Sequence, residues 1–157
     1  MTTPIQLMAI SPESFPAWRE RSSLEYENDL VAMGETAAIA QQRAQASLAG
    51  AFPEGHPTPD NAVFFVVDDA GSTVGYLWVG RDTSDDSSAW WVWDIVIDAE
   101  QRGRGLGRAT MQAAERYARS HGARTLGLNV FGFNHTARSL YETLGYDTTA
   151  IKMRKQL

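Results

Sequence analysis

The sequence predicts an α/β protein with a mixed β-sheet and helices on both of its faces. Segments rich in β-branched and aromatic residues alternate with helical stretches along the 157 residues. The segment WWVWDIVID (90–98) is apolar on both faces, as expected of a central strand. A strand, a loop, a helix and a further strand follow one another over residues 90–131, which predicts a right-handed βαβ unit.

The N-terminal third is expected to hold one strand and two helices. The strand is predicted over 5–10, and the helices over 12–31 and 35–50. Ser11 is the expected N-cap of the first helix, because a proline and a glutamate follow it. Three prolines and a glycine make 52–61 a loop.

An antiparallel hairpin follows, with strands at 62–69 and 72–80 and a turn around Gly71. After a polar turn at 81–88 comes the central strand at 90–98. The next helix is predicted from apolar residues that recur at helical spacing, and it is expected to end at Gly122. These residues are Leu106, Ala109, Ala113, Tyr117 and Ala118.

The C-terminal part is expected to be a strand at 125–132, a helix and a last strand at 149–155. Asn134 is a natural N-cap for this helix, and Gly145 is a natural stop. Its apolar stripe consists of Ala137, Leu140, Tyr141 and Leu144. No repeat or linker divides the chain, so we expect one domain over residues 1–157.

Composition narrows the classes of function. The chain has no cysteine, which excludes disulfides, thiolate metal sites and a cysteine nucleophile. Its three histidines lack the spacing of metal ligands, so no metal is expected. The N-terminus does not resemble a signal peptide, and no apolar run approaches the roughly 18 residues of a membrane span. We therefore expect a cytoplasmic protein that binds no membrane.

The charge is unevenly distributed along the chain. A net charge of −5 argues against nucleic-acid binding. Six of the 12 arginines nevertheless lie between Arg102 and Arg124. Such a basic island in an acidic protein predicts a small polyanionic ligand. For Arg116 and Arg119, a solvated helix face is the simpler explanation.

The segment DAEQRGRGLGR (98–108) lies between the central strand and a helix. Its glycines at 103, 105 and 107 would let backbone N–H groups converge, and the following helix adds a positive dipole end. The interleaved arginines bring forked donors suited to phosphate, which together predict a pyrophosphate cradle. The spacing does not match a P-loop or a dinucleotide-binding fingerprint. A flexible turn with incidental arginines is the structural alternative.

Two motifs in this half of the chain resemble those of the GNAT superfamily of N-acetyltransferases. RGRGLG (102–107) is similar to the signature R-x-x-G-x-G, and NHTARSLYETLGY (134–146) is similar to N-x-x-A-x-x-L-Y-x-x-x-G-[FY]. The resemblance covers about 60 residues, from Trp90 to Tyr146. The segments 53–59 and 75–78 also resemble small, poorly characterised bacterial members.

The resemblance implies a GNAT-like fold with a βαβ unit that binds acetyl-CoA, whose acetyl group is transferred directly to an amine in a ternary complex. It implies that Asn134 contacts the pantetheine arm, although an N-cap role explains this residue equally well. The strand edge and the cradle would bind the rest of the cofactor. The residues implied are Ile95, Val96, Ile97, Arg102, Gly103, Arg104, Gly105, Leu106, Gly107, Arg108 and Tyr141.

Two residues are candidates for proton transfer. Tyr141 occupies the family's general-acid position, where a phenol can protonate the leaving thiolate, but it also fits the apolar stripe of its helix. Strand alternation places Asp94 on one face with Val92 and Val96, where desolvation would raise its pKa and make it a general base. The family often has a glutamate here, so the shorter aspartate could act through a water or only orient the amine.

The acceptor site is expected between the N-terminal helices and the loop at 52–61. Reserve candidates for the base are His56 and Glu54 in this loop, and Glu25 and Glu27 in the first helix. Two other functions remain open, a non-catalytic acyl-CoA sensor and a nucleotide-binding regulatory domain. The amine is not identified, and a homodimer is an alternative to a monomer, because members of this superfamily are often dimers.

Overall fold

Five strands form one mixed sheet in the computed structural model, which describes residues 3–157. The strands lie side by side in chain order: β1 (Ile5–Ala9), β2 (Asn61–Asp68), β3 (Thr73–Arg81), β4 (Ala89–Ile97) and β5 (Thr125–Leu128). The first four pair antiparallel, and β5 runs parallel to β4. The predicted mixed sheet, with the 90–98 segment in an inner position, is therefore confirmed.

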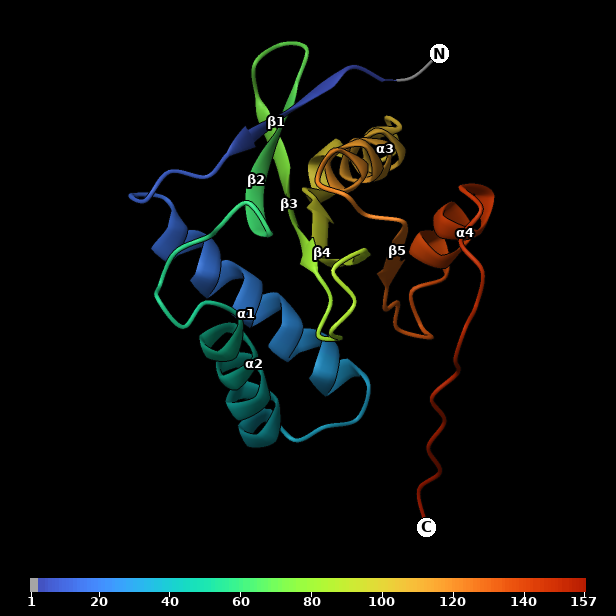
Figure 1. The fold of residues 1–157 in the computed structure, drawn as a ribbon. Coiled ribbons are helices and arrows are strands. Elements are labelled where there is room, and N and C mark those ends of the chain that lie inside the picture. Colours follow the sequence, from blue (N-terminus) through green and yellow to red (C-terminus); the bar gives the residue numbers. More distant parts are fainter. Residues whose placement is uncertain (1–2) are drawn as a thin grey trace.

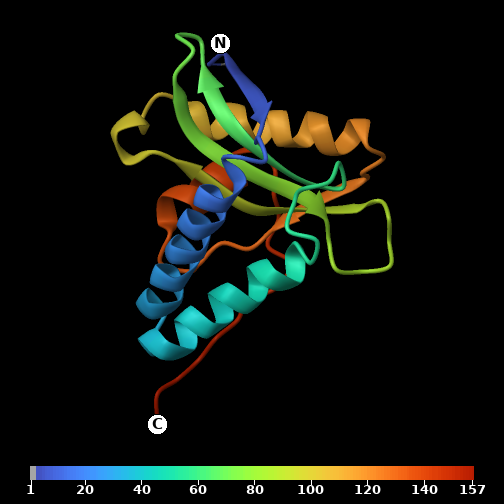
Figure 2. The same cartoon turned by 90° about the vertical axis from the view of Figure 1, so that its left-hand side faces the viewer.

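Helices cover both faces of this sheet, as predicted (Figures 1 and 2). On one face lie α1 (Phe15–Ala32) and α2 (Ala37–Ala51), and on the other lie α3 (Leu106–Ser120) and α4 (His135–Thr143). A short 3₁₀ turn, η1 (Ala99–Gln101), follows β4. The unit β4-α3-β5 joins two parallel strands through a helix, which is the predicted βαβ arrangement.

Two hydrophobic cores hold these layers together. The core beneath α3 contains Trp90 and Met111, which are 1% and 0% exposed. The core beneath α1 and α2 is aromatic, and its members pack edge to face or tilted at centroid distances of 5.0 to 5.9 Å. Those members are Phe15, Trp18, Phe52, Tyr76 and Trp78.

A β-bulge in β4 changes which residues share a face. Trp78 of β3 is paired with Asp94, whereas the next residue, Val79, is paired with Val92, so Trp93 is the extra residue. Val92 consequently packs under α3, while Val96 packs against the aromatic core under α1. The expectation that Asp94 shares a face with both valines is wrong for Val92, because simple alternation does not account for a bulge.

Two element boundaries differ from the predicted ones by three residues or more. α1 begins at Phe15 with Ser14 as its N-cap, because the carbonyl of Ser11 accepts the N–H groups of Ser14 and Phe15 in a preceding turn. β5 ends at Leu128 rather than at residue 132, because its pairing with β4 stops there.

The predicted last strand is also wrong. Within residues 3–157, the segment 149–155 is extended but joins no sheet (Figure 1). Arg154 instead donates a hydrogen bond to the backbone carbonyl of Met33, at 2.6 Å, and so holds the segment against the end of α1.

Candidate active site at the splayed end of β4

The sheet opens where β4 separates from β5. The two strands pair only from Ala89 with Thr125 to Val92 with Leu128. Beyond Val92, within the described residues, the edge of β4 that faces β5 has no strand partner. Its backbone N–H and C=O groups are therefore available to an extended, amide-containing ligand. The predicted cofactor residues Ile95, Val96 and Ile97 lie on this part of the strand.

The N-terminus of α3 supplies a second set of donors. The first bond inside the helix runs from the N–H of Ala109 to the carbonyl of Gly105. The N–H groups of Leu106, Gly107 and Arg108 therefore have no acceptor within the helix. They lie at its N-terminus, which is the positive end of the helix dipole. This arrangement is suited to an anion such as a pyrophosphate.

The three cradle glycines do not share one role. Gly103 and Gly105 have φ values of 81° and 77°, which favour glycine, and they turn the chain into α3. Gly107 lies within the helix, where an added Cβ would come within 3.3 Å of the Leu140 side chain on α4. This glycine therefore also allows α3 and α4 to pack closely, while its N–H is one of the free donors at the start of α3.

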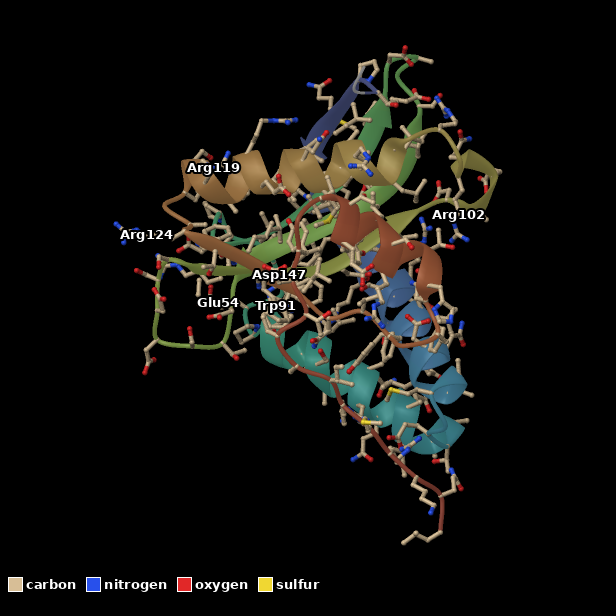
Figure 3. The ribbon with its side chains drawn as sticks, turned by 90° about the vertical axis from the view of Figure 1, so that its right-hand side faces the viewer. Glu54, Trp91, Arg102, Arg119, Arg124 and Asp147 are labelled. Carbon is tan, nitrogen blue, oxygen red and sulfur yellow. The ribbon has the colours of Figure 1, made fainter. Side chains whose placement is uncertain are left out.

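The arginines of the predicted basic island are spread over the molecule. Figure 3 shows Arg102 beyond one end of α3, and Arg119 and Arg124 at the opposite end. One surface patch does not form, because a helix of 15 residues separates the two groups. Near the cradle, Arg104 forms an ion pair of 3.2 Å with Asp68. This pair holds the Arg104 side chain at the end of β2.

Arg102 and Arg108 flank the start of α3. The Nε of Arg102 donates to the carbonyl of Ile97 at 3.2 Å, and Arg108 donates to the Thr143 hydroxyl at 2.6 Å. Both residues are exposed, and neither is paired with a carboxylate among the described residues. Their positive charge is therefore available to a phosphate group.

Asp94 lies where β4 leaves β5, on the side covered by α1. Its Oδ2 accepts hydrogen bonds from the Ser22 hydroxyl, at 2.7 Å, and the Tyr76 hydroxyl, at 2.8 Å. Ser22 is 3% exposed and Tyr76 is 1% exposed, so packing fixes both donors. No such bond to Oδ1 is found within residues 3–157, which leaves this oxygen for a substrate proton.

The surroundings of Asp94 shift its titration toward neutrality. Removal from water raises the pKa of Asp94 to about 6, and the negative charges of Glu25 and Asp29 on α1 act in the same direction. The hydrogen bonds from Ser22 and Tyr76 lower the pKa and limit the shift. A carboxylate with such a pKa is ionised at neutral pH and is a stronger base than an exposed aspartate.

Tyr141 approaches this region from α4. Its phenol is partly buried, and burial together with the charge of Asp94 raises its pKa, so it is protonated at neutral pH. The ring packs against Tyr146 at a centroid distance of 6.2 Å. The side chain of Asn134 accepts the N–H of Ala137 at 3.2 Å, so the predicted N-cap is confirmed.

The reserve candidates for a base are separated by the fold. Glu25 contributes charge at Asp94, whereas Glu27 lines a hollow of about 510 Å³ between α1 and α2 that contains no predicted cofactor residue. In the loop at 52–61, Glu54 and His56 are exposed and pair with each other at 3.6 Å. Within the described residues, neither side chain forms a hydrogen bond or an ion pair with Asp94.

Sequence reasoning missed the residues that surround Asp94. Ser22 and Tyr76 lie 72 and 18 residues away from it, and Arg21 lies 5.1 Å above the Tyr76 ring while its Nη2 bonds Asp98 at 2.7 Å. A polar serine on the buried face of α1 was the available signal, since a buried hydroxyl needs a partner.

Two further observations on the described chain concern membrane-spanning helices and metal-binding groups. In residues 3–157, none of the helices combines the length and apolar character needed to cross a membrane. In the same range, histidine, aspartate and glutamate side chains do not gather into a group of three or more that could hold a metal ion.

Comparison with known proteins relates this geometry to a family. Residues 40–146 match the model of the acetyltransferase (GNAT) family. The uncharacterized N-acetyltransferase YdgE of Bacillus subtilis is 29% identical over 149 residues, which cover 94% of this chain and 95% of YdgE. The crystal structure of the acetyltransferase YycN from Bacillus subtilis has a TM-score of 0.89 and 28% identity, and covers 98% of this chain and 99% of YycN.

The same fold occurs in more distant enzymes. The aminoglycoside N-acetyltransferase AAC(6')-Iy, solved in complex with CoA, has a TM-score of 0.58 and 17% identity, and covers 100% of this chain and 98% of its own. The family model spans more than half of this chain. It includes the segment 102–107 at the start of α3 and the segment 134–146, which covers α4. The protein therefore belongs to the acetyltransferase (GNAT) family and is an acyl-CoA-dependent N-acyltransferase.

Proposed function

We propose that residues 1–157 act as one N-acetyltransferase domain that transfers an acetyl group from acetyl-CoA to an amine, with both substrates bound together. The observation that carries this proposal is Asp94, whose carboxylate is held beside the free edge of β4 with one oxygen open. Family membership and the CoA-bound relative support CoA as the carrier of the acyl group.

The chain offers a separate group for each part of the cofactor. The free N–H groups at the start of α3, together with Arg102 and Arg108, would bind the pyrophosphate. The edge of β4 from Ile95 to Ile97 would pair with the amides of the pantetheine arm, which would bring the thioester between β4 and Tyr141. Bound acetyl-CoA supplies an activated acyl group.

Two side chains would move the protons. Asp94 accepts a proton from the amine as the new C–N bond forms, and Tyr141 donates its phenolic proton to the sulfur as the C–S bond breaks. The raised pKa of each group suits its role, because Asp94 gains basicity and Tyr141 keeps its proton. Since the chain has no cysteine, no cysteine acyl-enzyme is formed.

The amine would approach from the side of α1. Glu25 and Asp29 on this helix act on Asp94 through their charge, so the approach to the base is negative. A negative approach attracts a protonated amine. The amine releases its extra proton to solvent before attack, and Asp94 accepts the second proton as the C–N bond forms. The identity of the amine is left to a screen.

The first test is calorimetric titration with acetyl-CoA, with CoA, NAD and ATP as comparisons. Binding of acetyl-CoA and CoA alone is expected. Arg102→Gln should weaken the binding about tenfold, which corresponds to one charge-assisted contact. Arg119→Gln is the matched control, because Arg119 is exposed at the opposite end of α3 (Figure 3). Failure of the unmodified protein to bind acetyl-CoA would reject the proposed function.

The second test measures free thiol released from acetyl-CoA in the presence of a panel of amines. Tyr141→Phe should reduce kcat about tenfold or more with unchanged acetyl-CoA binding, because only the proton donor is lost. Tyr146→Phe is the control on the same side of the sheet, since its hydroxyl binds Glu115 instead. Full activity of Tyr141→Phe would remove this residue from the mechanism.

A further inference from the structure

Tryptophan side chains gather on the face of the sheet that carries Asp94. The ring of Trp93 stacks on that of Trp78 at a centroid distance of 5.8 Å, and Trp78 belongs to the aromatic core beneath α1. The Trp91 ring lies 6.2 Å from the Trp93 ring, and Figure 3 shows Trp91 on the side of the sheet that faces α2. Trp91 and Trp93 together form an aromatic platform on this face.

The bulge in β4 brings the platform next to the carboxylate. In a regular strand, consecutive side chains point to opposite faces. Trp93 is the extra residue of the bulge, and its ring packs on Trp78, which is the strand partner of Asp94. Asp94 itself accepts the hydroxyl of Ser22 on α1 at 2.7 Å. An indole and the proposed base therefore lie on one face although they are neighbours in the chain.

Gly127 of β5 makes room for the outer ring of the platform. This glycine is the partner of Trp91 in the parallel ladder. A Cβ at position 127 would collide with the six-membered ring of Trp91. The Trp91 ring therefore lies over β5, and the platform extends from β4 across its parallel neighbour.

The aromatic rings become more exposed from the core to the platform. Phe52 and Trp78 are 3% and 5% exposed and lie 5.0 Å apart, whereas Trp93 is 37% exposed. The indole nitrogen of Trp93 donates to the carbonyl of Arg81 at 3.2 Å, which fixes the orientation of the ring. Contiguous exposed apolar surface of this kind is typical of a binding site. The series of stacked rings thus ends at an indole that a further ring can contact.

We propose that the aromatic platform binds an aromatic ring of the acceptor, which is a primary amine joined to that ring by a short carbon chain. This inference rests on the proposed acetyl transfer, because it assigns the acceptor of that reaction. The ring would stack on Trp93, while the amine nitrogen would meet the free oxygen of Asp94. The charges are complementary, since Glu25 and Asp29 add negative charge at Asp94 and the acceptor arrives as a cation.

The spacing of the two groups sets the length of the linker. Trp93 and Asp94 are consecutive, so their Cα atoms are about 3.8 Å apart. Stacked rings have centroids roughly 4.5–7 Å apart, so a ring over Trp93 reaches Asp94 through about two or three carbon atoms. The reaction itself is unchanged: the amine nitrogen bonds to the acetyl carbon, the C–S bond breaks, and CoA leaves as the free thiol.

The first experiment compares 2-phenylethylamine with 2-cyclohexylethylamine in the thiol-release assay. The two amines bury similar apolar areas but differ in aromatic character. The unmodified protein should have a kcat/KM about fivefold higher for the phenyl compound, the equivalent of roughly 1 kcal/mol. Trp93→Leu should remove this preference, mainly through KM, because the ring is bound alike before and during the reaction. Trp93→Phe keeps a ring and should retain most of the preference.

The second experiment measures binding without turnover. The CoA-bound protein is titrated with 2-phenylethylamine, and binding is followed by tryptophan fluorescence. Trp93→Leu should weaken this binding at least about fivefold. Leu24→Ala is the matched control, because Leu24 is 55% exposed but lines the hollow between α1 and α2. Since Trp93 is at the surface, its variants should fold, which circular dichroism checks.

The outcomes separate this inference from the proposed transfer. Absence of 2-phenylethylamine binding to the CoA-bound protein would overturn the inference, and turnover of other amines would then leave the proposed transfer intact. Equal kcat/KM values for the two amines, or a preference that survives Trp93→Leu, would also overturn it. Binding that depends on Trp93 without any release of thiol would instead reject the proposed transfer and retain the platform as a ligand site.

Discussion

The two halves of β4 have different surroundings although they belong to one strand. From Ala89 to Val92 the strand pairs with β3 on one side and with β5 on the other. From Asp94 to Ile97 it pairs only with β3 within the described residues, and Trp93 is the bulged residue between the two halves. The first half carries Trp90, which is 1% exposed, whereas the second half carries Asp94 with one free oxygen.

This difference shows how one strand can serve both stability and chemistry. The bulge at Trp93 lies between the halves and turns Asp94 toward α1, away from the core beneath α3. The first half lets apolar side chains be buried, and the second leaves backbone groups and a carboxylate available to ligands. Substitutions in the two halves should therefore affect different measurements.

The largest expected effect is on stability, in the first half. Trp90→Ala should lower the free energy of unfolding by about 3–5 kcal/mol, because it leaves a large cavity under α3. Trp93→Ala, at a side chain that is 37% exposed, should cost about 1 kcal/mol. Urea unfolding followed by circular dichroism measures both. Equal losses would contradict the division of β4 into two halves.

The next effect is on turnover, in the second half. Asp94→Asn should lower kcat about 100-fold, because the amide cannot accept the amine proton. Its fold should be retained, since an amide oxygen can still accept from Ser22 or Tyr76. Asp69→Asn, the same change at an exposed turn residue, should leave kcat unchanged. The thiol-release assay measures both variants, and full activity of Asp94→Asn would exclude Asp94 as the base.

The same carboxylate should make stability depend on pH. The pKa of Asp94 is raised from 3.8 to about 6 on folding, so the folded state binds more protons than the unfolded state between these values. The contribution of Asp94 is therefore fully present below pH 3.8, and about 3 kcal/mol is lost as the pH rises from 3.8 through 6. The Asp94→Asn variant should not show this loss. Plots of the free energy of unfolding in urea against pH should therefore diverge between the variant and the unmodified protein toward neutral pH. Parallel curves would show that Asp94 is not desolvated.

The smallest effect concerns the support of Asp94 by α1. Ser22→Ala removes a hydrogen bond that lowers the pKa of Asp94, so the acidic limb of the kcat profile should move to higher pH. The shift should stay below about one pH unit, the equivalent of one hydrogen bond. Ser23→Ala is the control, because Ser23 lines the hollow between α1 and α2. An unmoved limb would mean that Ser22 does not set the ionisation of Asp94.

Much of the architecture could be predicted from local patterns. The apolar run at 90–98 required an inner strand, and the glycines at 103 and 105 marked the turn into α3. The predicted strand at 149–155 failed, although its alternation is that of a strand, because a strand forms only where a partner edge is available. Local propensity does not specify that partner.

The sequence by itself determined the family motifs, the βαβ unit and the acidic residue on its first strand. These follow from short-range rules, since periodicity, glycine conformations and helix caps act within a few residues. Only the tertiary structure decided that a bulge turns Asp94 toward α1 and that Ser22 and Tyr76 donate to one of its oxygens. It also decided that Gly107 serves helix packing. These contacts join residues far apart in the chain, and their geometry depends on packing between layers that no local pattern encodes.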